Sequence, residues 1–520
     1  MDRPVRTVVI GAGIGGLATA IRLAHAGHQV TVVDLHDAPG GKMRTLPSAA
    51  GPVDAGPTVM TMRPVFARLF ADVGDRLENH VTLHPETILA RHIWPDGSKL
   101  DLFADAHATH DAIGAFAGAQ AQREFAAFNT TAKRLFDGFD RPMMQAARPN
   151  LLGLTAHVLR HPRLIPAMAP GRSLAQLLAR HFTDPRLRQL FGRYATYLGG
   201  SPMQSPAVLA LIWQSEAQGV WRVEGGMHRL PRAMHDLAVR LGATFHFGQA
   251  ASHIVQQGGR VTAVYLADGT QLPADIAVFN GDPKALHDGL LGTSPQTAVK
   301  PAGVAPRSLS AFVWAFAAQP DGVPLAHHNI FFAADPVAEF NDLAAGRMPA
   351  DPTLYVCAQD RGGLPPKGLE RFEIIMNGPA GYTGGPEEIE TCRTRTFETL
   401  HKMGLRFSPA AGPDALTTPS GFNRLFPASD GSLYGRSPHG MMAAFQRPTA
   451  KTSLPGLYLA GGGVHPGAGI PMACLSGQHA AAAILSDLAS TLPSRPMAMP
   501  GGMSTGSATM ASGQSRSSAS

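Results

Sequence analysis

The chain has 520 residues, 44% of them hydrophobic and 16% charged, which suits a large globular protein of about two or three structural units. Its net charge of +6 agrees with an anionic partner, but nothing resembles a nucleic-acid-binding module, so we expect no nucleic acid partner. No run of about twenty apolar residues predicts a transmembrane helix, and the first predicted strand leaves no room for a signal peptide. Cys357, Cys392 and Cys474 are widely separated, so we expect buried free thiols and no metal site.

The N-terminal segment predicts a strand, a helix and a second strand, with a glycine-rich turn before the helix. Val8 to Ile10 suit a buried parallel strand, and Gly11, Gly13 and Gly16 follow with the spacing G-x-G-x-x-G. The first glycine permits a tight turn, the second lets the backbone approach a pyrophosphate, and the third lets helix and strand pack closely. The helix N-terminus favours phosphates, and Asp34, after the second strand, suits a ribose hydroxyl. The segment therefore predicts an adenine dinucleotide site.

A second loop follows this unit, and we expect it to contact the same cofactor. Gly40 and Gly41 suit a tight loop over a bound nucleotide, and Lys42 and Arg44 would offset pyrophosphate charge. An ordinary loop with solvated cations is the alternative, but the position directly after the dinucleotide unit favours a cofactor contact. The next segment adds Gly56, Pro57 and Thr58 to the predicted contacts.

Residues 106–204 predict a helical region that faces a membrane. Between Arg141 and Thr183 there is no acidic residue, whereas six arginines alternate with apolar side chains and with prolines that break any long helix. Unopposed cations beside apolar side chains suit the surface of an anionic bilayer. A basic helical face on a soluble lid is the alternative.

The remaining chain predicts a return to the first domain, a separate α+β region and a tail. We expect a helix over residues 228–241 and strands over 243–247, 252–257, 260–266 and 275–280, then an antiparallel sheet with a helix over 386–403. A strand at 457–460 leads into a second glycine-rich loop and a helix over 472–488. Residues 491–520 lack periodicity and predict a disordered tail.

The second glycine-rich loop has the same binding features as the first. Close backbone approach followed by helix N-terminal amides suits electron-rich ligand atoms, in particular those of a flavin ring. A glycine-rich core loop without a ligand is the alternative. The predicted contacts are Gly461, Gly462, Gly463, Gly469, Ile470, Pro471 and Met472.

Together, GAGIGGLATAIRLAHAGHQVTVVD (residues 11–34) and GLYLAGGGVHPGAGIPMACLSG (residues 456–477) resemble the bacterial-type carotenoid desaturases. These are FAD enzymes related to phytoene desaturase, within the amine-oxidase-like flavoproteins. The likeness continues through DAGPTVMT (54–61), GVWRVEGGM (219–227), AVFNGDP (277–283) and SLYGRSPHG (432–440), although many relatives have an aromatic residue and a proline at Arg222-Val223. Within the family the chain looks most like the hydroxyneurosporene (methoxyneurosporene) desaturases.

The resemblance implies an α/β fold with a Rossmann-type FAD-binding domain in three parts (1–105, 205–297 and 416–490). It also implies an α+β substrate domain (298–415) and a helical, membrane-facing subdomain (106–204). Gly11, Gly13, Gly16 and Asp34 would hold the ADP half of FAD, and Gly40, Gly41, Lys42 and Arg44 would lie near the pyrophosphate and ribityl chain. Gly461–Gly463 and Gly469–Met472 would meet the ribityl chain and the flavin.

The implied reaction is formation of the 3,4 double bond of a 1-hydroxy or 1-methoxy carotenoid by hydride transfer to flavin, in spheroidene and spirilloxanthin synthesis. The implied location is the cytoplasmic side of the inner (intracytoplasmic) membrane, with peripheral association. The electron acceptor, a quinone or oxygen, stays open. Alternatives are another carotenoid desaturase (phytoene or neurosporene type), an amine oxidase and a non-catalytic lipid-escort protein. An NAD-dependent dehydrogenase is disfavoured by the second glycine-rich loop.

No strongly basic catalytic residue is required, because hydride loss beside a polyene leaves a delocalised cation and positioning carries much of the rate. The candidate bases by position are Glu224 and His465, each beside a glycine-rich cofactor segment. His465 fits a structural role or a flavin contact equally well.

Overall fold

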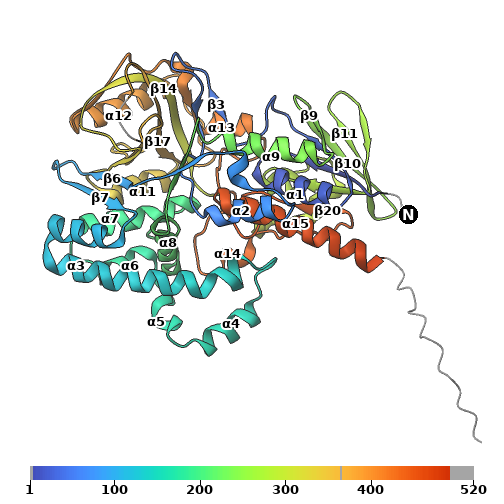
Figure 1. Cartoon of the computed structure of the whole chain (residues 1–520), viewed down its shortest axis with the longest axis horizontal. Coiled ribbons are helices and arrows are strands. Elements are labelled where there is room, and N and C mark those ends of the chain that lie inside the picture. Colours follow the sequence, from blue (N-terminus) through green and yellow to red (C-terminus); the bar gives the residue numbers. More distant parts are fainter. Residues whose placement is uncertain (1–3, 363–365, 492–520) are drawn as a thin grey trace, which may run out of the picture.

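The computed structural model of the chain describes residues 4–362 and 366–491. Two sheets and a helical region organise it (Figure 1). The first sheet has five parallel strands in the order β20-β13-β1-β2-β9. Their bounds are Leu457–Leu459 (β20), Ile276–Phe279 (β13), Arg6–Ile10 (β1), Gln29–Val33 (β2) and Thr244–His246 (β9).

Both faces of this sheet are covered, which explains why its strands are almost continuously apolar. Val9 packs into a core that includes α1 (Ile14–His25), α2 (Arg63–Ala71), α9 (Arg229–Arg240) and α15 (Ile470–Thr491). Val8 and Ile10 point to the opposite face and pack against an antiparallel layer of β10 (Ala251–Gln257), β11 (Arg260–Leu266) and β12 (Gln271–Pro273). The predicted strands over residues 252–257, 260–266 and 275–280 are confirmed to within about a residue.

The first and last helices of this layer are locked together. A Cβ on Gly477 of α15 would lie 2.3 Å from the carbonyl oxygen of Gly15 in α1, so the two backbones touch. The hydroxyl of Thr19 donates to the carbonyls of both glycines, at 2.8 Å to Gly15 and 3.2 Å to Gly477. Residues more than 450 positions apart thus form one rigid pair of helices.

The second sheet is mixed and mostly antiparallel, in the order β18-β14-β17-β16-β15-β6-β7, with β19 also paired to β14. Its bounds are Leu405–Ser408 (β18), Ser310–Gly322 (β14), Glu370–Gly378 (β17), Leu354–Ala358 (β16), His328–Phe331 (β15), Ile88–Ile93 (β6), Lys99–Phe103 (β7) and Leu416–Thr417 (β19). Helix α12 (Glu388–Lys402) covers one face and corresponds to the helix predicted over residues 386–403. Strands β6 and β7 lie in this sheet although their residues fall within the range 1–105; the domain boundaries themselves stay a prediction.

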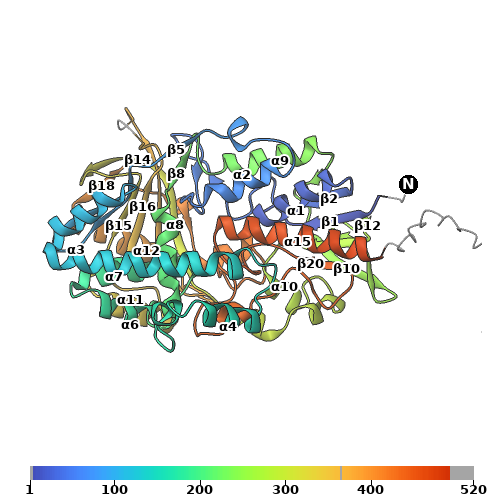
Figure 2. The same ribbon diagram turned by 60° about the horizontal axis from the view of Figure 1, so that its bottom comes forward.

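The helical region lies along the other face of the second sheet (Figure 2). It comprises α3 (Ala106–Phe139, kinked at Gly118), α4 (Leu151–Arg160), α5 (Leu164–Met168), α6 (Leu174–His181), α7 (Pro185–Gly192) and α8 (Ile212–Ala217). Stacked rings of Phe125, Phe128, Phe182 and Phe191 fill its core. Helix α4 has no buried residue and projects from the molecule with α5 (Figure 1).

Shorter elements complete the fold. They are β3 (Thr45–Leu46), β4 (Val53–Asp54), β5 (Leu83–Pro85), β8 (Trp221–Val223), α10 (Pro283–His287), α11 (Pro336–Ala344), α13 (Pro419–Leu425) and α14 (Ala443–Gln446). Across residues 4–362 and 366–491, no helix combines the length and apolar character that crossing a bilayer requires. The three cysteines are buried and free, as predicted. Residues 492–520, almost all of the predicted tail, lie outside the described residues.

Candidate cofactor and substrate site

Two glycine-rich segments from opposite ends of the chain meet at the carboxyl edge of the parallel sheet. Gly11 follows β1 with a φ of 107°, and Gly13 caps the start of α1. A Cβ on Gly16 would lie 2.0 Å from the carbonyl oxygen of Gly11, so strand and helix are as close as the motif predicts. A Cβ on Gly15 would lie 2.6 Å from the amide nitrogen of Gly461, so the first turn lies directly against the second segment.

Asp34 follows β2 and is buried beside the first turn. Its Oδ2 accepts from the amide of Ala12 at 2.6 Å, and its Oδ1 accepts from the amide of His36 at 2.8 Å. Burial raises the pKa of this carboxyl, and the two amide hydrogen bonds oppose the rise. A carboxylate oxygen accepts more than one hydrogen bond, so a bond from a ribose hydroxyl to Asp34 stays a prediction that this geometry permits.

The loop that follows lies on the first turn. Gly40 pairs with Gly13 in an isolated bridge, and a Cβ on Gly41 would lie 3.3 Å from the Cα of Gly13. Their φ values of 127° and 57° both favour glycine. Gly56 is required by close approach, because a Cβ there would lie 1.9 Å from the carbonyl oxygen of Lys42.

Neither predicted cation of this loop is solvated at the surface. Lys42 Nζ donates to the carbonyl of Leu433 at 2.6 Å, and burial lowers the pKa of Lys42 to about 8, although the charge of Asp282 opposes that shift. Arg44 Nη2 donates to the hydroxyl of Thr417 at 2.5 Å. Arg44 Nε is buried and has no hydrogen-bond partner among the described residues.

Asp54 at the end of β4 ties the same region to α9. Its carboxylate accepts from the amides of Met227 at 2.6 Å and His228 at 3.1 Å. Gly226 has a φ of 101°, and a Cβ there would lie 2.7 Å from Asp54 Oδ2. The side-chain amide of Gln359 bonds both the backbone N–H and the backbone carbonyl of Asp54.

Asn280 is a residue that the sequence analysis missed. It follows β13 and lies between the two glycine-rich segments, where its Nδ2 donates to the carbonyl of Gly11 at 3.1 Å. A Cβ on Gly461 would lie 2.8 Å from Asn280 Oδ1, and this buried oxygen has no partner among the described residues. The amide of Gly461 donates to Ser476 Oγ at 2.7 Å. The available signal is the position of Asn280 in the AVFNGDP segment, at the end of the strand predicted over 275–280.

The rest of the second segment divides into packed and open positions. A Cβ on Gly463 would lie 2.6 Å from Pro283, whereas a Cβ on Gly462 would meet nothing within 4 Å. Gly469, with a φ of 101°, also faces open space apart from an atom of Pro471 at 4.0 Å. The first turn of α15 follows, with Ile470, Pro471 and Met472.

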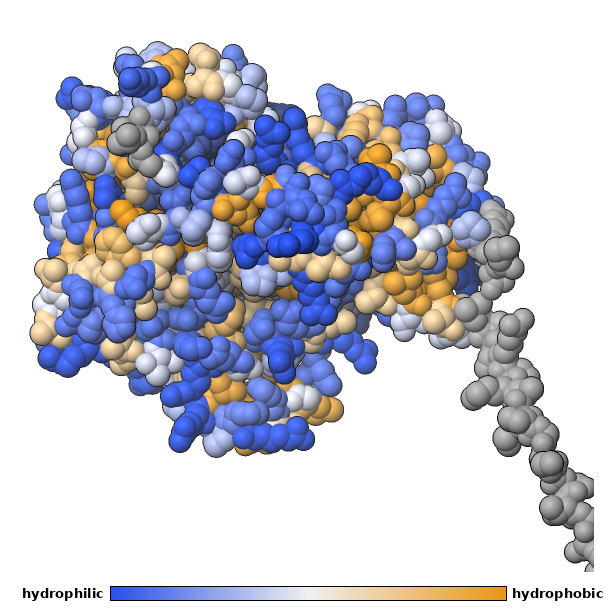
Figure 3. Space-filling view, in the orientation of Figure 1, coloured by the Kyte–Doolittle hydropathy of each residue, from blue (hydrophilic) through white to orange (hydrophobic). Residues whose placement is uncertain are grey.

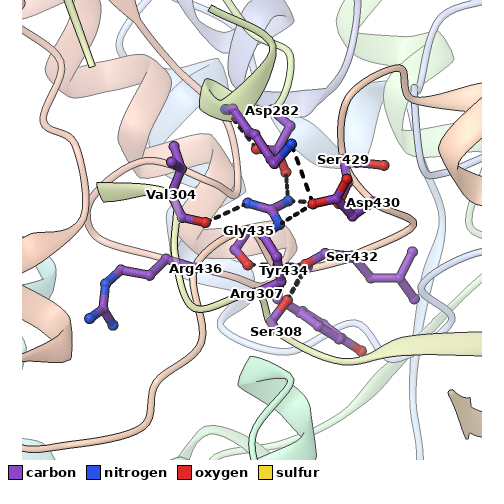
Figure 4. Close-up of polar contacts among 12 residues, drawn as sticks. Asp282, Val304, Arg307, Ser308, Ser429, Asp430, Ser432, Tyr434, Gly435 and Arg436 are labelled. Atoms are coloured by element: carbon purple, nitrogen blue, oxygen red, sulfur yellow. Dashed lines mark hydrogen bonds and ion pairs between the residues drawn. The ribbon is translucent and has the colours of Figure 1, made fainter. Parts of the chain in front are cut away.

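Two buried arginines near this segment were not predicted. Arg307 Nη2 pairs with Asp282 at 2.5 Å, and Arg307 lies between Asp282 and Asp430 (Figure 4). Arg447 Nη1 donates to the carbonyl of Gly462 at 3.0 Å, and burial lowers the pKa of Arg447 to about 10. These residues are scattered over more than 160 positions, so no local pattern identifies them.

A cavity of about 470 Å³ opens beside the two segments, a size typical of small-molecule sites. Pro57 and Thr58 line one part of it, and Gly469–Pro471 line another. Most other wall residues are apolar and come from the second sheet and the helical region, such as Ile330 and Ile375. Tyr434 also lines it and is held by a hydrogen bond from its amide to Ser308 Oγ at 3.1 Å (Figure 4).

A hydrogen-bonded polar chain lies at the part of the cavity near Thr58. Thr58 Oγ1 is 2.8 Å from the hydroxyl of Tyr355, and it donates to Glu373 Oε2 at 3.2 Å. His328 Nδ1 is 2.7 Å from the same tyrosine hydroxyl. Burial raises the pKa of Glu373 well above its usual range and lowers the pKa of His328 well below its own, so their surroundings disfavour the charged form of both groups.

One group of side chains has the composition of a metal site. Ligand atoms of His327, His328 and Cys357 lie within 4.8 Å of one another. His327 Nδ1 is already bonded to the carbonyl of Arg361 at 2.8 Å, and burial raises the pKa of Cys357 well above its usual range, which keeps it a thiol. This chemistry does not favour a metal ion, and the absence of a metal site stays a prediction.

The two candidate bases lie outside the cavity wall. Glu224 is 63% exposed at its side chain, and its carboxylate is 2.8 Å from the ring of His84. His465 is buried, and its Nε2 donates to the carbonyl of Ala146 at 2.8 Å. Burial lowers the pKa of His465, so the ring is neutral. Neither residue lines the cavity, and His465 has the contacts of a structural histidine. A catalytic role for either residue stays a prediction.

The residues present fit a bound FAD. Arg44 Nε and Asn280 Oδ1 are a buried donor and a buried acceptor that lack partners in the described residues. Open space faces Gly462 and Gly469. Buried polar atoms of this kind, next to glycines that line empty space, are what a polar ligand completes. The parallel sheet, the two glycine-rich segments and the adjoining cavity define a flavin-dependent oxidoreductase.

Comparison with known proteins agrees with this class. Residues 14–332 match the family described as flavin containing amine oxidoreductase. The fold also matches a crystal structure of an oxidoreductase from Methanosarcina mazei, with a TM-score of 0.59 and 16% identity over 93% of this chain and all of that one.

Closer relatives specify the branch. A hydroxyneurosporene desaturase of Cereibacter sphaeroides is 58% identical over 486 residues, which cover 93% of this chain and 98% of that protein. A hydroxyneurosporene desaturase of Rhodobacter capsulatus is 54% identical over 481 residues, covering 92% and 97%. The chain belongs to the carotenoid desaturase family of flavoproteins, and its cofactor is FAD.

Proposed function

We propose that the chain is an FAD-dependent carotenoid desaturase that introduces the C-3,4 double bond into 1-hydroxy or 1-methoxy acyclic carotenoids. The observation that carries the proposal is a mostly apolar cavity that reaches both Thr58 and Gly469–Pro471, in a chain 58% identical to a hydroxyneurosporene desaturase. An apolar wall suits a hydrocarbon chain, and a wall next to the predicted flavin contacts places the reacting end near the hydride acceptor.

Bound FAD supplies a hydride acceptor for the C–H bond that breaks. The chain contributes position and exclusion of water, because apolar residues line most of the cavity. The hydrogen-bonded chain of Thr58, Tyr355 and Glu373 adds polar groups at that end. Glu224 and His465 lie away from the wall, so the proposal assigns the proton to neither.

The test uses the visible spectrum of the holoenzyme. Anaerobic 1-hydroxyneurosporene should bleach the blue absorption of bound flavin, and chromatography should detect a product with one more conjugated double bond. Amines should leave the spectrum unchanged. Feeding neurosporene, 1-hydroxyneurosporene and lycopene derivatives separates this function from a phytoene-type or neurosporene-type desaturase. Bleaching by neurosporene but not by its 1-hydroxy derivative would refute the 3,4-desaturase assignment.

We propose that the protein associates peripherally with the cytoplasmic side of the inner (intracytoplasmic) membrane through the lobe formed by α4 and α5. Leu152 is 83% exposed and Leu159 is 68% exposed, although both are large apolar side chains. Arg160 and Arg163 are exposed beside them. Hydrophobic and hydrophilic side chains lie side by side on this projecting lobe (Figure 3). Such a surface suits the headgroup region of an anionic bilayer, from which a water-insoluble carotenoid has to be taken.

Reversing the charge of Arg160 and Arg163 together to glutamate should weaken binding to anionic vesicles about 30-fold or more, since each cation near a membrane surface contributes about 1 kcal/mol. FAD content should not change. A control variant with glutamate at Arg260 and Arg406, both exposed outside the lobe, should bind vesicles like the wild type. Equal vesicle binding by the two variants would remove the docking assignment. The electron acceptor, a quinone or oxygen, stays open.

A further inference from the structure

One wall residue of the cavity has hydrogen-bond donors that nothing in the described chain uses. Arg193 lines the cavity, and its Nε and Nη2 are buried without a hydrogen-bond partner among the described residues. Its side chain is only 11% exposed. A buried donor without an acceptor costs about 1–3 kcal/mol, and for a charged group the cost is higher, so these donors call for an acceptor that the described residues do not supply with hydrogen-bond geometry.

The surroundings hold this guanidinium rigidly and balance its charge. Arg193 Nη1 donates to the hydroxyl of Tyr197 at 2.8 Å, and Nη2 is 3.5 Å from Glu216 Oε2. The hydroxyls of Tyr194 and Tyr197 both donate to Glu216. The guanidinium carbon lies 4.8 Å and 5.3 Å from the centroids of these two rings. The two rings and the carboxylate restrict the conformation of the Arg193 side chain before a ligand binds. This restriction lowers the entropic cost of binding.

Other polar residues of the same wall already have partners. Arg188 donates to the carbonyls of Phe182 at 2.6 Å and Thr183 at 3.1 Å. Gln189 donates to the carbonyl of Ala333 and accepts from Trp94. Arg193 therefore stands apart among them, in a wall that is otherwise mostly apolar.

Arg193 lines the same cavity as the predicted cofactor contacts. Thr58 and Gly469–Pro471 are part of the wall that also contains Arg193 and its partner Tyr197. In a carotenoid desaturated at C-3,4, the oxygen on C-1 is only a few bonds from the reacting carbons, so its binding partner has to lie in the cavity that adjoins the cofactor contacts.

We propose that Arg193, positioned by Tyr197 and Glu216, binds the oxygen on C-1 of the substrate end group and thereby selects oxygenated carotenoids. The proposal rests on the function proposed above. A guanidinium only donates, so it serves an ether oxygen as well as a hydroxyl oxygen, and the site accepts 1-methoxy and 1-hydroxy ends alike. A hydrocarbon end leaves the buried donors unpaired, and that penalty provides discrimination.

The test compares Arg193→Met with Arg188→Met in the FAD-loaded enzyme. Both variants remove a guanidinium from the same wall, but of the two only Arg193 has buried donors that lack a hydrogen-bond partner among the described residues. Equilibrium binding of 1-hydroxyneurosporene and neurosporene is measured with flavin chemically reduced, a state in which no further hydride can be accepted. Arg193→Met should lose about 10- to 100-fold of the preference for the hydroxylated ligand, as expected for one charge-assisted hydrogen bond. Arg188→Met should keep that preference.

The conservative variant Tyr197→Phe keeps the guanidinium but removes one support, so it should lose a smaller part of the same preference. An Arg193→Met enzyme that retains FAD and still prefers the hydroxylated ligand as strongly as the wild type would overturn the proposal. If Arg193→Met fails to hold FAD, the test uses Tyr197→Phe and 1-methoxyneurosporene. The wild type must bind 1-methoxyneurosporene more tightly than neurosporene. Tyr197→Phe must reduce this difference in affinity. A wild type that desaturates no oxygenated carotenoid would instead contradict the proposed function.

Discussion

The cofactor region and the cavity wall are built by different means. Around the predicted FAD site, backbone atoms and glycines make the close contacts: Gly16 against Gly11, Gly41 against Gly13, and Gly15 against Gly461. Around the cavity, side chains from separate strands and helices make them, as in the Thr58–Tyr355–Glu373 chain. The first kind of contact can be recognised in the sequence because only glycine fits. The second kind leaves none, since tyrosine and glutamate occur in many environments.

The comparison predicts that a single methyl group is most damaging in the cofactor region. Gly16→Ala puts a Cβ 2.0 Å from the backbone oxygen of Gly11, which has no flexible side chain to yield. We expect loss of bound FAD and a destabilisation of about 3 kcal/mol or more, measured by flavin absorbance and thermal unfolding. Gly412→Ala is the control, because a Cβ there meets nothing within 4 Å. An FAD-replete Gly16→Ala enzyme with a wild-type melting temperature would contradict the close-packing argument.

In the cavity wall the comparison predicts a pH effect in place of a steric one. Glu339 on α11 lines the cavity, accepts from Thr353 Oγ1 at 2.7 Å, and burial raises the pKa of Glu339 to about 7. Below about pH 4.5 the carboxyl is protonated in both folded and unfolded chains. Between about pH 4.5 and 7 only the unfolded chain ionises, so stability falls as pH rises, by about 3 kcal/mol in all.

Glu339→Gln should therefore gain stability relative to the wild type between pH 5 and pH 7.5, as thermal unfolding at the two values will show. Glu398→Gln, at an exposed position of the neighbouring helix α12, should show no such pH-dependent gain. A constant difference between Glu339→Gln and the wild type at both pH values would mean that this carboxyl keeps an ordinary pKa.

The smallest expected effect separates the cofactor from the fold. A Cβ on Gly462 meets no protein atom within 4 Å, so Gly462→Ala should leave the apoprotein as stable as Gly412→Ala does. If FAD occupies that space, as the sequence predicts, Gly462→Ala should weaken FAD binding about 10-fold, or about 1.4 kcal/mol. Titration of apoprotein with FAD measures this. Unaltered affinity would show that Gly462 does not face the cofactor.

Much of the fold followed from local patterns. The first strand, the helix after it, and the strands over residues 252–257 and 260–266 agree with the structure because their hydrophobic periodicity is strong. The assignment of β6 and β7 to the second sheet did not follow, since their partner β15 lies more than 200 residues away. Glu224 was a reasonable candidate by position, but folding leaves it exposed beside His84.

By itself the sequence determined the cofactor, the family and the two glycine-rich segments at Gly11–Gly16 and Gly461–Gly463. The reason is that close backbone approach requires glycine at particular single positions. Only the tertiary structure decided which side chains surround those segments and the cavity. Asn280 and Arg447 become partners of the first and second segments through strand register and loop packing, and Arg307 comes to pair with Asp282. The role of Arg193 also depends on tertiary structure. Its donors become buried without hydrogen-bond partners among the described residues only in the folded chain, where Tyr197 and Glu216 contact it.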